Sequence, residues 1–209
     1  MADVPVDRRR HWRRVWREKE ESAVSWFEPH PALSLALIEA AGVGPEDAII
    51  DVGGGASRLV DALLERGFRD LTVLDLAEEA LARARARLGA RAQAVHWIVA
   101  DVTRWRPPRR YRLWHDRAVF HFLVEEPDRA RYLEVLAGAL EPGGQVVIAT
   151  FAPDAPPRCS GLPVRRWSAE ELAGAFGAGF RLAEHRRQVH TTPGGVVQPF
   201  TWLRLERIA

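Results

Sequence analysis

A run of apolar residues that leads into three glycines is the feature that most constrains how this 209-residue chain can fold. Residues 48–52 read Ala-Ile-Ile-Asp-Val, and Gly53, Gly54 and Gly55 follow directly. This order is typical of a buried strand that turns into a helix, because glycine adopts dihedral angles forbidden to other residues and lets the backbone come close to a ligand. The stretch therefore predicts an α/β fold with a nucleotide-type binding site at the turn.

Short strands alternate with helices along most of the remaining sequence. The predicted strands cover residues 48–52, 71–75, 95–100, 111–115 and 145–151, and the predicted helices cover 57–66, 77–88 and 128–140. Alternation of this kind implies a parallel sheet covered by helices on both faces. Ligands of such sheets bind at the carboxyl ends of the strands.

The end of the chain follows a different pattern. We expect a helix over residues 169–176 and strands over 181–189 and 198–205. Gly194 and Gly195 lie between the two strands and predict a hairpin turn. The last pair of strands is therefore expected to be antiparallel.

The sequence before residue 46 predicts a helical addition to this fold. Residues 7–20 place Trp12, Val15 and Trp16 on one helical face, and Pro31 begins a second helix. We expect residues 1–45 to form an N-terminal lid segment and residues 46–209 to form a single α/β domain. A chain of this length buries one sizeable core and is short for two.

Composition narrows the compartment and the partners. No apolar run approaches the roughly 20 residues needed to span a bilayer, and the lone Cys159 can form neither an internal disulfide nor a thiolate metal cluster. We therefore expect a cytoplasmic protein with no metal site and no membrane partner. Glu18 and Glu20 follow the arginines around Trp12, and the net charge is only +2, so nucleic acid is not an expected partner.

Three predicted strands carry an aspartate at or near their carboxyl ends. Asp51 precedes the glycine turn, Asp75 ends the second strand and Asp101 follows the third. A carboxylate about twenty residues after the turn accepts hydrogen bonds from ribose hydroxyls in nucleoside-binding folds. The third acid is placed to accept from an adenine amino group. Together the three acids predict contacts to a nucleoside at one edge of the sheet.

The residues around the turn favour one cofactor over another. In a dinucleotide fingerprint a third glycine would stand where Arg58 is found. The carboxylate of Asp51 would also repel a pyrophosphate, whereas it would attract the ammonium group of an amino-acid-bearing cofactor. The sequence therefore favours S-adenosylmethionine over NAD(P).

From about residue 47 onward the sequence resembles the class I S-adenosylmethionine-dependent methyltransferases. The matching segments are residues 51–55, 74–75, 100–102 and 140–144. The resemblance implies a Rossmann-like, doubly wound α/β sheet of seven strands, mostly parallel, with helices on both faces and a C-terminal antiparallel hairpin. The residues it implies for S-adenosylmethionine binding are Asp51, Gly53, Gly54, Gly55, Asp75, Leu76, Asp101 and Val102.

Three tryptophans before the domain extend the resemblance. Trp12, Trp16 and Trp26 look like aromatic residues that help to cover the cofactor in the lysine methyltransferases of elongation factor 1A and citrate synthase. A lysine after the fourth strand also lies near the cofactor there, and Arg117 stands at that place here. The resemblance adds these four residues to the expected cofactor site. In the alternative reading, the tryptophans only pack their helix onto the domain.

The end of the fourth strand holds the candidates for catalysis. His115, Asp116 and His121 lie where an acceptor would meet the methyl group, and each could orient or deprotonate it. The elongation-factor enzymes carry an acid near the place of His121, so their lysine substrate does not carry over. Two simpler readings stay open: His121 as a buried helix residue, and Asp116 as an ion-pair partner of Arg117.

We therefore expect a methyltransferase that moves a methyl group by direct displacement from S-adenosylmethionine to a small molecule or a protein side chain. No Asn/Asp-Pro-Pro-aromatic motif follows the fourth strand, so methylation of a flipped base is not indicated. The alternatives are an NAD(P)-dependent oxidoreductase and a binding subunit that holds S-adenosylmethionine without turnover. The sequence predicts neither the accepting atom nor the oligomeric state.

Overall fold

The structure of the protein, a computed structural model, describes residues 7–208. Its main sheet comprises β1 (Ile49–Val52), β2 (Leu71–Asp75), β3 (Val95–Val99), β4 (Tyr111–Arg117), β5 (Leu140–Phe151), β8 (Phe180–Thr191) and β9 (Val197–Arg207). The α-helices are α1 (Arg8–Glu18), α2 (Ala32–Ala40), α3 (Leu59–Glu65), α4 (Glu78–Leu88), α5 (Glu126–Ala139) and α6 (Ala169–Phe176). Short 3₁₀ turns η1 (Glu21–Ala23), η2 (Gly89–Ala94), η3 (Phe120–Phe122) and η4 (Gly177–Gly179) join several of them.

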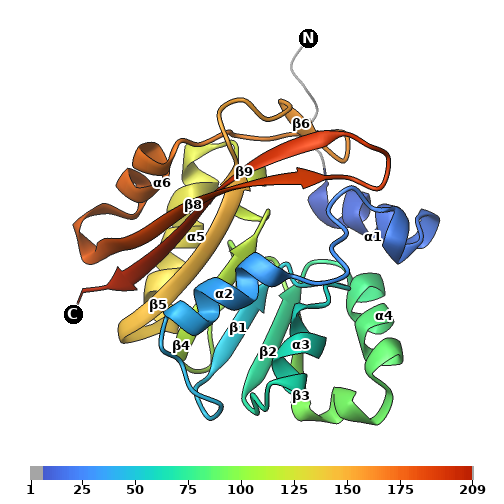
Figure 1. Ribbon diagram of the computed structural model, residues 1–209, viewed down its shortest axis with the longest axis horizontal. Coiled ribbons are helices and arrows are strands. Elements are labelled where there is room, and N and C mark those ends of the chain that lie inside the picture. The colour runs from blue at the N-terminus through green and yellow to red at the C-terminus, as the bar shows by residue number, and fades with distance from the viewer. Residues whose placement is uncertain (1–6, 209) are drawn as a thin grey trace.

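The strands form one seven-stranded sheet in the order β3-β2-β1-β4-β5-β9-β8 (Figure 1). Strands β1 to β5 pair in parallel, whereas β9 pairs antiparallel with both β5 and β8. The strand order reverses between β1 and β4, which is the switch point where ligands bind in open α/β sheets. The predicted fold class, including the antiparallel C-terminal hairpin, is confirmed.

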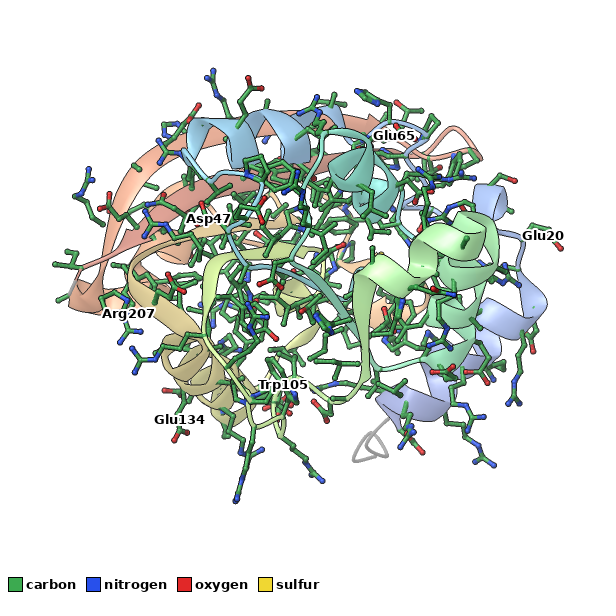
Figure 2. All side chains as sticks on the ribbon, turned by 90° about the horizontal axis from the view of Figure 1, so that it is seen from below. Glu20, Asp47, Glu65, Trp105, Glu134 and Arg207 are labelled. Atoms are coloured by element: carbon green, nitrogen blue, oxygen red, sulfur yellow. The ribbon has the colours of Figure 1, made fainter. Side chains whose placement is uncertain are left out.

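The pleat of the buried strands divides the core into two layers. Ile49 packs with α2, α3 and α4 on one face, and Ile50 packs with α5 and α6 on the other. Successive side chains of a strand point to opposite faces, so apolar residues are needed at every position of a strand that helices cover on both sides. Figure 2 shows charged side chains such as Glu20 and Glu134 pointing away from this core.

Two local features differ from the predicted elements. Strand β5 begins at Leu140 rather than near residue 145, with a register irregularity against β4 between Tyr111 and Leu113. Residues 158–163, where no strand is predicted, form a small antiparallel hairpin of β6 (Arg158–Cys159) and β7 (Leu162–Pro163). Its turn residues Ser160 and Gly161 both have positive φ, which suits the twist of a two-residue hairpin.

The N-terminal segment meets the domain in two ways. Leu35 and Ile38 of α2 belong to the same buried cluster as β1. Helix α1 lies across the carboxyl end of the sheet beside α4, beneath the β8–β9 hairpin (Figure 1). These contacts do not test whether the lid segment ends and the domain begins between residues 45 and 46, so that boundary stays a prediction. Among residues 7–208, no helix is both long and apolar enough to cross a bilayer.

Candidate active site

A cavity opens at the carboxyl ends of β1 to β4, where α1 covers the sheet. It holds about 920 Å³ of empty space, its open mouth included, and its walls are mostly apolar. Side chains from distant parts of the sequence meet here because parallel strands bring their carboxyl ends to one edge. The expected cofactor residues in its wall are Trp12, Trp16, Trp26, Gly53, Asp75, Leu76, Asp101, Val102 and Arg117.

A second, smaller cavity adjoins the first and shares Trp16, Trp26, Gly53 and Arg117 with it. Its wall also contains Asp51, Gly54 and His115. The two cavities thus meet at the glycine turn and at Arg117. Gly55 lines neither, although it lies directly behind Asp75.

The glycine turn leaves no space for side chains. A Cβ on Gly53 would lie 2.0 Å from Cγ2 of Val119, and the φ of Gly53 is +68°. A Cβ on Gly54 would lie 2.4 Å from a carboxylate oxygen of Asp51, and one on Gly55 would lie 2.9 Å from a carboxylate oxygen of Asp75. Glycine is therefore required for the backbone to pass this close to both acids.

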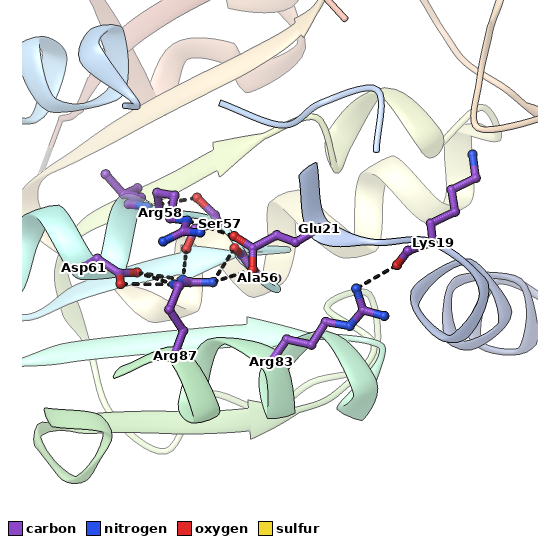
Figure 3. A network of polar contacts seen from close by, with 9 residues as sticks. Lys19, Glu21, Ala56, Ser57, Arg58, Asp61, Arg83 and Arg87 are labelled. Carbon is purple, nitrogen blue, oxygen red and sulfur yellow. Dashed lines mark hydrogen bonds and ion pairs between the residues drawn. The ribbon is translucent and has the colours of Figure 1, made fainter. Parts of the chain in front are cut away.

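An ion-pair network holds the segment after the turn (Figure 3). Arg87 donates to the carbonyl oxygens of Ala56 and Ser57 at 3.0 and 2.8 Å, and it also pairs with Asp61 and Glu21. Arg58 lies 2.8 Å from Glu21, so it faces the N-terminal segment. The arginine that breaks the dinucleotide fingerprint thus helps to fix the turn.

Asp75 and Asp101 lie in the wall of the larger cavity. One oxygen of Asp75 accepts from the N–H of Ala77 at 2.8 Å, and Oδ1 of Asp101 accepts from the N–H and hydroxyl of Thr103. Burial, with the charge of Asp51 nearby, raises the pKa of Asp75 from 3.8 to about 7. A hydroxyl donor from a ligand would stabilise the ionised form of this carboxylate.

Asp51 belongs to a buried chain of hydrogen bonds. Its Oδ1 lies 2.7 Å from Nδ1 of His115, and Nε2 of that ring lies 3.0 Å from the hydroxyl of Ser34 on α2. All three side chains are buried. Both nitrogens of the imidazole are therefore engaged, and His115 holds Asp51 in place at the second cavity.

Arg117 stands between the two cavities and is only partly neutralised. Its Nη1 donates to the carbonyl oxygen of Trp26 at 2.9 Å, and its Nη2 lies 3.3 Å from Oε1 of Glu28. The Nε and Nη2 groups are buried and form no hydrogen bond with the described residues. Burial lowers the pKa of Arg117, the guanidinium of which lies 5.1 Å from the ring centroid of Phe200.

The three N-terminal tryptophans form one aromatic cluster over the cavities. The ring centroid of Trp26 lies 5.6 Å from that of Trp12 and 5.7 Å from that of Trp16. Trp12 also contacts Phe122 of η3, at 5.0 Å. These rings both pack α1 onto the domain and line the larger cavity, so packing and a role in the site are compatible.

Asp116 does not face either cavity, contrary to the expectation that it could act on an acceptor. It follows His115 in β4, so the pleat turns its side chain to the opposite face of the sheet. There its carboxylate accepts hydrogen bonds from the N–H groups of Val119 and Phe120 and from the hydroxyl of Tyr132. Burial raises its pKa to about 6. It fixes the loop after β4 and forms no ion pair with Arg117.

His121 also lies outside both cavities. Its ring packs between Phe122 and Phe151, and its Nδ1 accepts from the N–H of Phe151 at 3.2 Å. Burial and the charge of Arg117 lower its pKa to about 3, so the ring is neutral. The simpler reading, a buried histidine, describes this residue, and the expectation of a catalytic base does not.

Comparison with known proteins identifies the domain. Residues 49–144 match the family model described as a methyltransferase domain. That segment contains the glycine turn and strands β1 to β4, in the sheet order described above. Residues 49–144 thus match a methyltransferase domain, and the fold of the chain is that of the S-adenosylmethionine-dependent methyltransferases.

Two curated methyltransferases share part of this domain. The eEF1A lysine and N-terminal methyltransferase of Danio rerio is 26% identical over 146 residues, which are 68% of this chain and 21% of that protein. A trans-aconitate 2-methyltransferase of Rhodopseudomonas palustris is 31% identical over 107 residues, 51% of this chain and 38% of that protein. The chain thus spans about a fifth of the first relative's length. The predicted family resemblance is confirmed, and neither alternative function gains support.

Solved structures share the fold of the methyltransferase domain over nearly the whole chain. An S-adenosylmethionine-dependent methyltransferase from Anabaena variabilis is 15% identical with a TM-score of 0.76 and covers 99% of this chain and 98% of its own. The 1,6-didemethyltoxoflavin N1-methyltransferase of Burkholderia thailandensis is 20% identical with a TM-score of 0.71 and covers 100% and 94%. At sequence identities of 15% and 20%, these structures show that the chain shares their fold and nothing further.

The methyltransferase domain fits S-adenosylmethionine at three points. The glycine turn brings the backbone of Gly53 and Gly54 into the cavity walls. Asp75 and Asp101 provide carboxylates in the cavity wall, and the unpartnered N–H groups of Arg117 provide a buried cation. The two carboxylates can accept from the hydroxyls and the adenine amino group of that cofactor, and the arginine can donate to its carboxylate.

Several cavity residues were not found from the sequence. Phe122, Gln198 and Phe200 line the larger cavity, the last two from β9. No motif marks Gln198 and Phe200, because β9 reaches the cavity only through the antiparallel return of the chain. Cys159 lies there too, and burial raises the pKa of its thiol to about 11.

Proposed function

We propose that this protein transfers a methyl group from S-adenosylmethionine by direct displacement to a small-molecule acceptor held in the larger cavity. The observation that carries the proposal is the continuity of that cavity. It runs from the strand-end acids Asp75 and Asp101 past the glycine turn to Phe122 and Phe200. A donor and an acceptor can therefore lie in one enclosed space, and holding them in line supplies much of the acceleration.

The cofactor is held by residues of both cavities. When bound, S-adenosylmethionine supplies an electrophilic methyl group on a sulfonium centre. Asp75 would accept hydrogen bonds from the ribose hydroxyls, and Asp101 would accept one from adenine. Asp51, oriented by His115, would attract the ammonium group, and Arg117 would donate to the carboxylate. His115 is thus a positioning residue.

Water is kept from the reacting atoms by aromatic side chains. Trp12, Trp16 and Trp26 cover the site from α1 and the segment after it, and their rings strengthen the electrostatic contacts beneath them by excluding solvent. No general base is assigned. Asp116 and His121 line neither cavity, and both nitrogens of His115 are engaged. A proton on the acceptor would therefore leave to bulk solvent after the methyl group has been transferred.

Calorimetry and labelling test this function. Titration with S-adenosylhomocysteine is expected to show binding and titration with NADPH none. Methyl-labelled S-adenosylmethionine, incubated with the protein and a cell extract, is expected to label the small-molecule fraction. Label in the protein fraction would move the acceptor to a side chain, and label confined to nucleic acid would contradict the proposal. The cytoplasmic location and the absence of a nucleic-acid partner stay predictions.

A further inference from the structure

The part of the larger cavity beyond the cofactor residues has a distinct chemistry. It lies over the ends of β4 and β9 and next to the β6–β7 hairpin, and its wall includes Trp12, Phe122, Cys159, Gln198 and Phe200. Three of these side chains are aromatic. Aromatic walls favour a flat ring, which can stack on them or meet their edges.

Besides Arg117, the cavity wall holds a second polar residue with an unpartnered buried group, Gln198. It is only 6% exposed, and its amide oxygen is buried without a hydrogen-bond partner among residues 7–208. Leaving such a group unpartnered costs about 1–3 kcal/mol, and unlike the unpartnered hydroxyl of Thr150, Gln198 lines a cavity from which a ligand can supply the partner.

Two other glutamines show what a structural role looks like in this fold. The amide of Gln188 accepts from Nε1 of Trp202 and donates to Glu28. The amide of Gln145 accepts from Arg204 and donates to the carbonyl oxygen of Gly143. Both are engaged at each end, whereas the oxygen of Gln198 is not. Gln188 and Gln145 thus stabilise the sheet, whereas Gln198 keeps an acceptor that a ligand could use.

The charges around the cavity indicate an uncharged ligand. Arg8, at one side of the wall, pairs with Asp128 at 2.5 Å. Arg117 lies 3.3 Å from Glu28, and the proposed function directs its remaining N–H groups to the cofactor. A buried acceptor carboxylate would find Arg8 paired and the free N–H groups of Arg117 directed to the cofactor, and burying an uncompensated charge is costly.

We propose that Gln198 binds the methyl acceptor, and that the acceptor is an uncharged flat ring with an N–H beside a carbonyl, as in a cyclic amide. A glutamine amide can present its N–H₂ or, after a half-turn, its oxygen, so it suits a ligand edge that both donates and accepts. A ligand carboxylate can only accept hydrogen bonds, so it would use only one of these two capacities. This inference rests on the proposed function and names the substrate class of the same site.

The test uses the protein saturated with S-adenosylhomocysteine and two probes of equal ring size, 2-pyridone and benzoate. We expect 2-pyridone to bind to this complex, by ligand-observed NMR or calorimetry, and benzoate to bind at least about tenfold more weakly. Gln198→Leu is expected to lower the affinity for 2-pyridone about tenfold, as expected for one lost buried hydrogen bond. The affinity for S-adenosylhomocysteine should not change.

Two further variants control for shape and for folding. Gln198→Glu keeps the shape of the side chain but removes the N–H₂ donor, and at pH 8 it is expected to lose 2-pyridone as the leucine variant does. Gln93→Leu, on the exposed side of η2, should bind both ligands like the parent protein. Preference for benzoate, or 2-pyridone affinity unchanged in both Gln198 variants, would overturn the inference. Failure of the parent protein to bind S-adenosylhomocysteine would instead contradict the proposed function.

Discussion

The ends of β2 and β3 differ from the end of β4 in how their polar residues are used. Asp75 and Asp101 stand at or just past the last residue of their strands and line the larger cavity. His115 and Asp116 lie one or two positions inside β4, and their hydrogen bonds go to α2, to the loop after β4 and to α5. Of these four residues, the two at or past the strand end line the larger cavity, whereas the two inside β4 do not.

The same comparison explains why the pKa values at the two places have different consequences. Burial raises the pKa of Asp75 to about 7 and that of Asp116 to about 6. Asp116 has three donors from the chain itself, so its environment is complete without a ligand. Asp75 lines a cavity, so a ligand can complete its environment. A perturbed pKa therefore marks a binding site only when the cavity wall contains the group.

The largest expected effect is on stability, at Asp116. Asp116→Ala removes the acceptor of three buried hydrogen bonds and leaves their donors unpartnered, which should lower the free energy of unfolding by about 3 kcal/mol. Denaturant unfolding measures this change, and the affinity for S-adenosylhomocysteine in the folded fraction should stay within about twofold. Tyr132→Phe, which removes one of the three donors, is the matched control and should cost about 1–2 kcal/mol. A large loss of affinity for S-adenosylhomocysteine with unchanged stability would instead mean that Asp116 belongs to the binding site and not to the packing of the fold.

Asp75 should show the opposite pattern. Asp75→Asn keeps an oxygen for the N–H of Ala77 but removes the charge and one acceptor, so the affinity for S-adenosylhomocysteine should fall about 100-fold. Thermal unfolding of the free protein at pH 8 should not be lowered, because a buried carboxylate is costly when ionised. Calorimetry provides the affinity. Equal affinities of variant and parent would mean that the ribose does not lie at Asp75.

The pH dependence of binding gives a sharper test of the same carboxylate. Its pKa of about 7 in the free protein means that it holds a proton at pH 5.5, and hydroxyl donors favour the ionised form. Affinity for S-adenosylhomocysteine should therefore fall up to about tenfold per pH unit below pH 7 and level off above it. Asp75→Asn should flatten this profile, and Asp101→Asn should preserve it.

The stability of the free protein should depend on pH in the opposite sense. The folded-state pKa of Asp75 lies above its unfolded value of 3.8, so the folded state binds more protons between about pH 4 and pH 7. The stability that this group contributes is therefore full below pH 4 and is lost as the pH rises to 7. Urea unfolding across this range, with Asp75→Asn as the reference, measures the loss.

Sequence reasoning placed residues in the cavity wall where their position follows from strand ends, and it fell short elsewhere. The glycine turn and the acids after β2 and β3 could be predicted, because parallel strands always bring those positions to one edge. The role of Asp116 could not, because a shift of one residue along β4 changes the face of the sheet. Gln198 could not either, since it reaches the cavity on an antiparallel strand that the chain adds to the sheet after β5.

A smaller effect separates backbone strain from close packing at the turn. Gly53 and Gly42 have nearly equal φ values, +68° and +67°, but a Cβ on Gly53 would meet Val119 whereas one on Gly42 would meet nothing within 4 Å. Gly42→Ala should thus cost about 1 kcal/mol of stability from strain alone, and Gly53→Ala about 1–2 kcal/mol more. Thermal unfolding measures both. Equal costs would mean that Val119 makes room for a side chain at Gly53, and close packing would then not be the reason for a glycine there.

The smallest effect is expected where α1 meets α4 at the surface. Glu79 accepts from Arg13 and Arg17 of α1, each at 2.9 Å, whereas its neighbour Glu78 pairs with Arg85 of its own helix. Exposed pairs contribute less than about 1 kcal/mol, so Glu79→Ala should lower stability by at most that, and 0.5 M salt should remove the difference. Glu78→Ala serves as the control. If only the Glu79 variant releases S-adenosylhomocysteine faster in stopped-flow tryptophan fluorescence, α1 acts as a lid; equal release rates would leave its tryptophans a packing role alone.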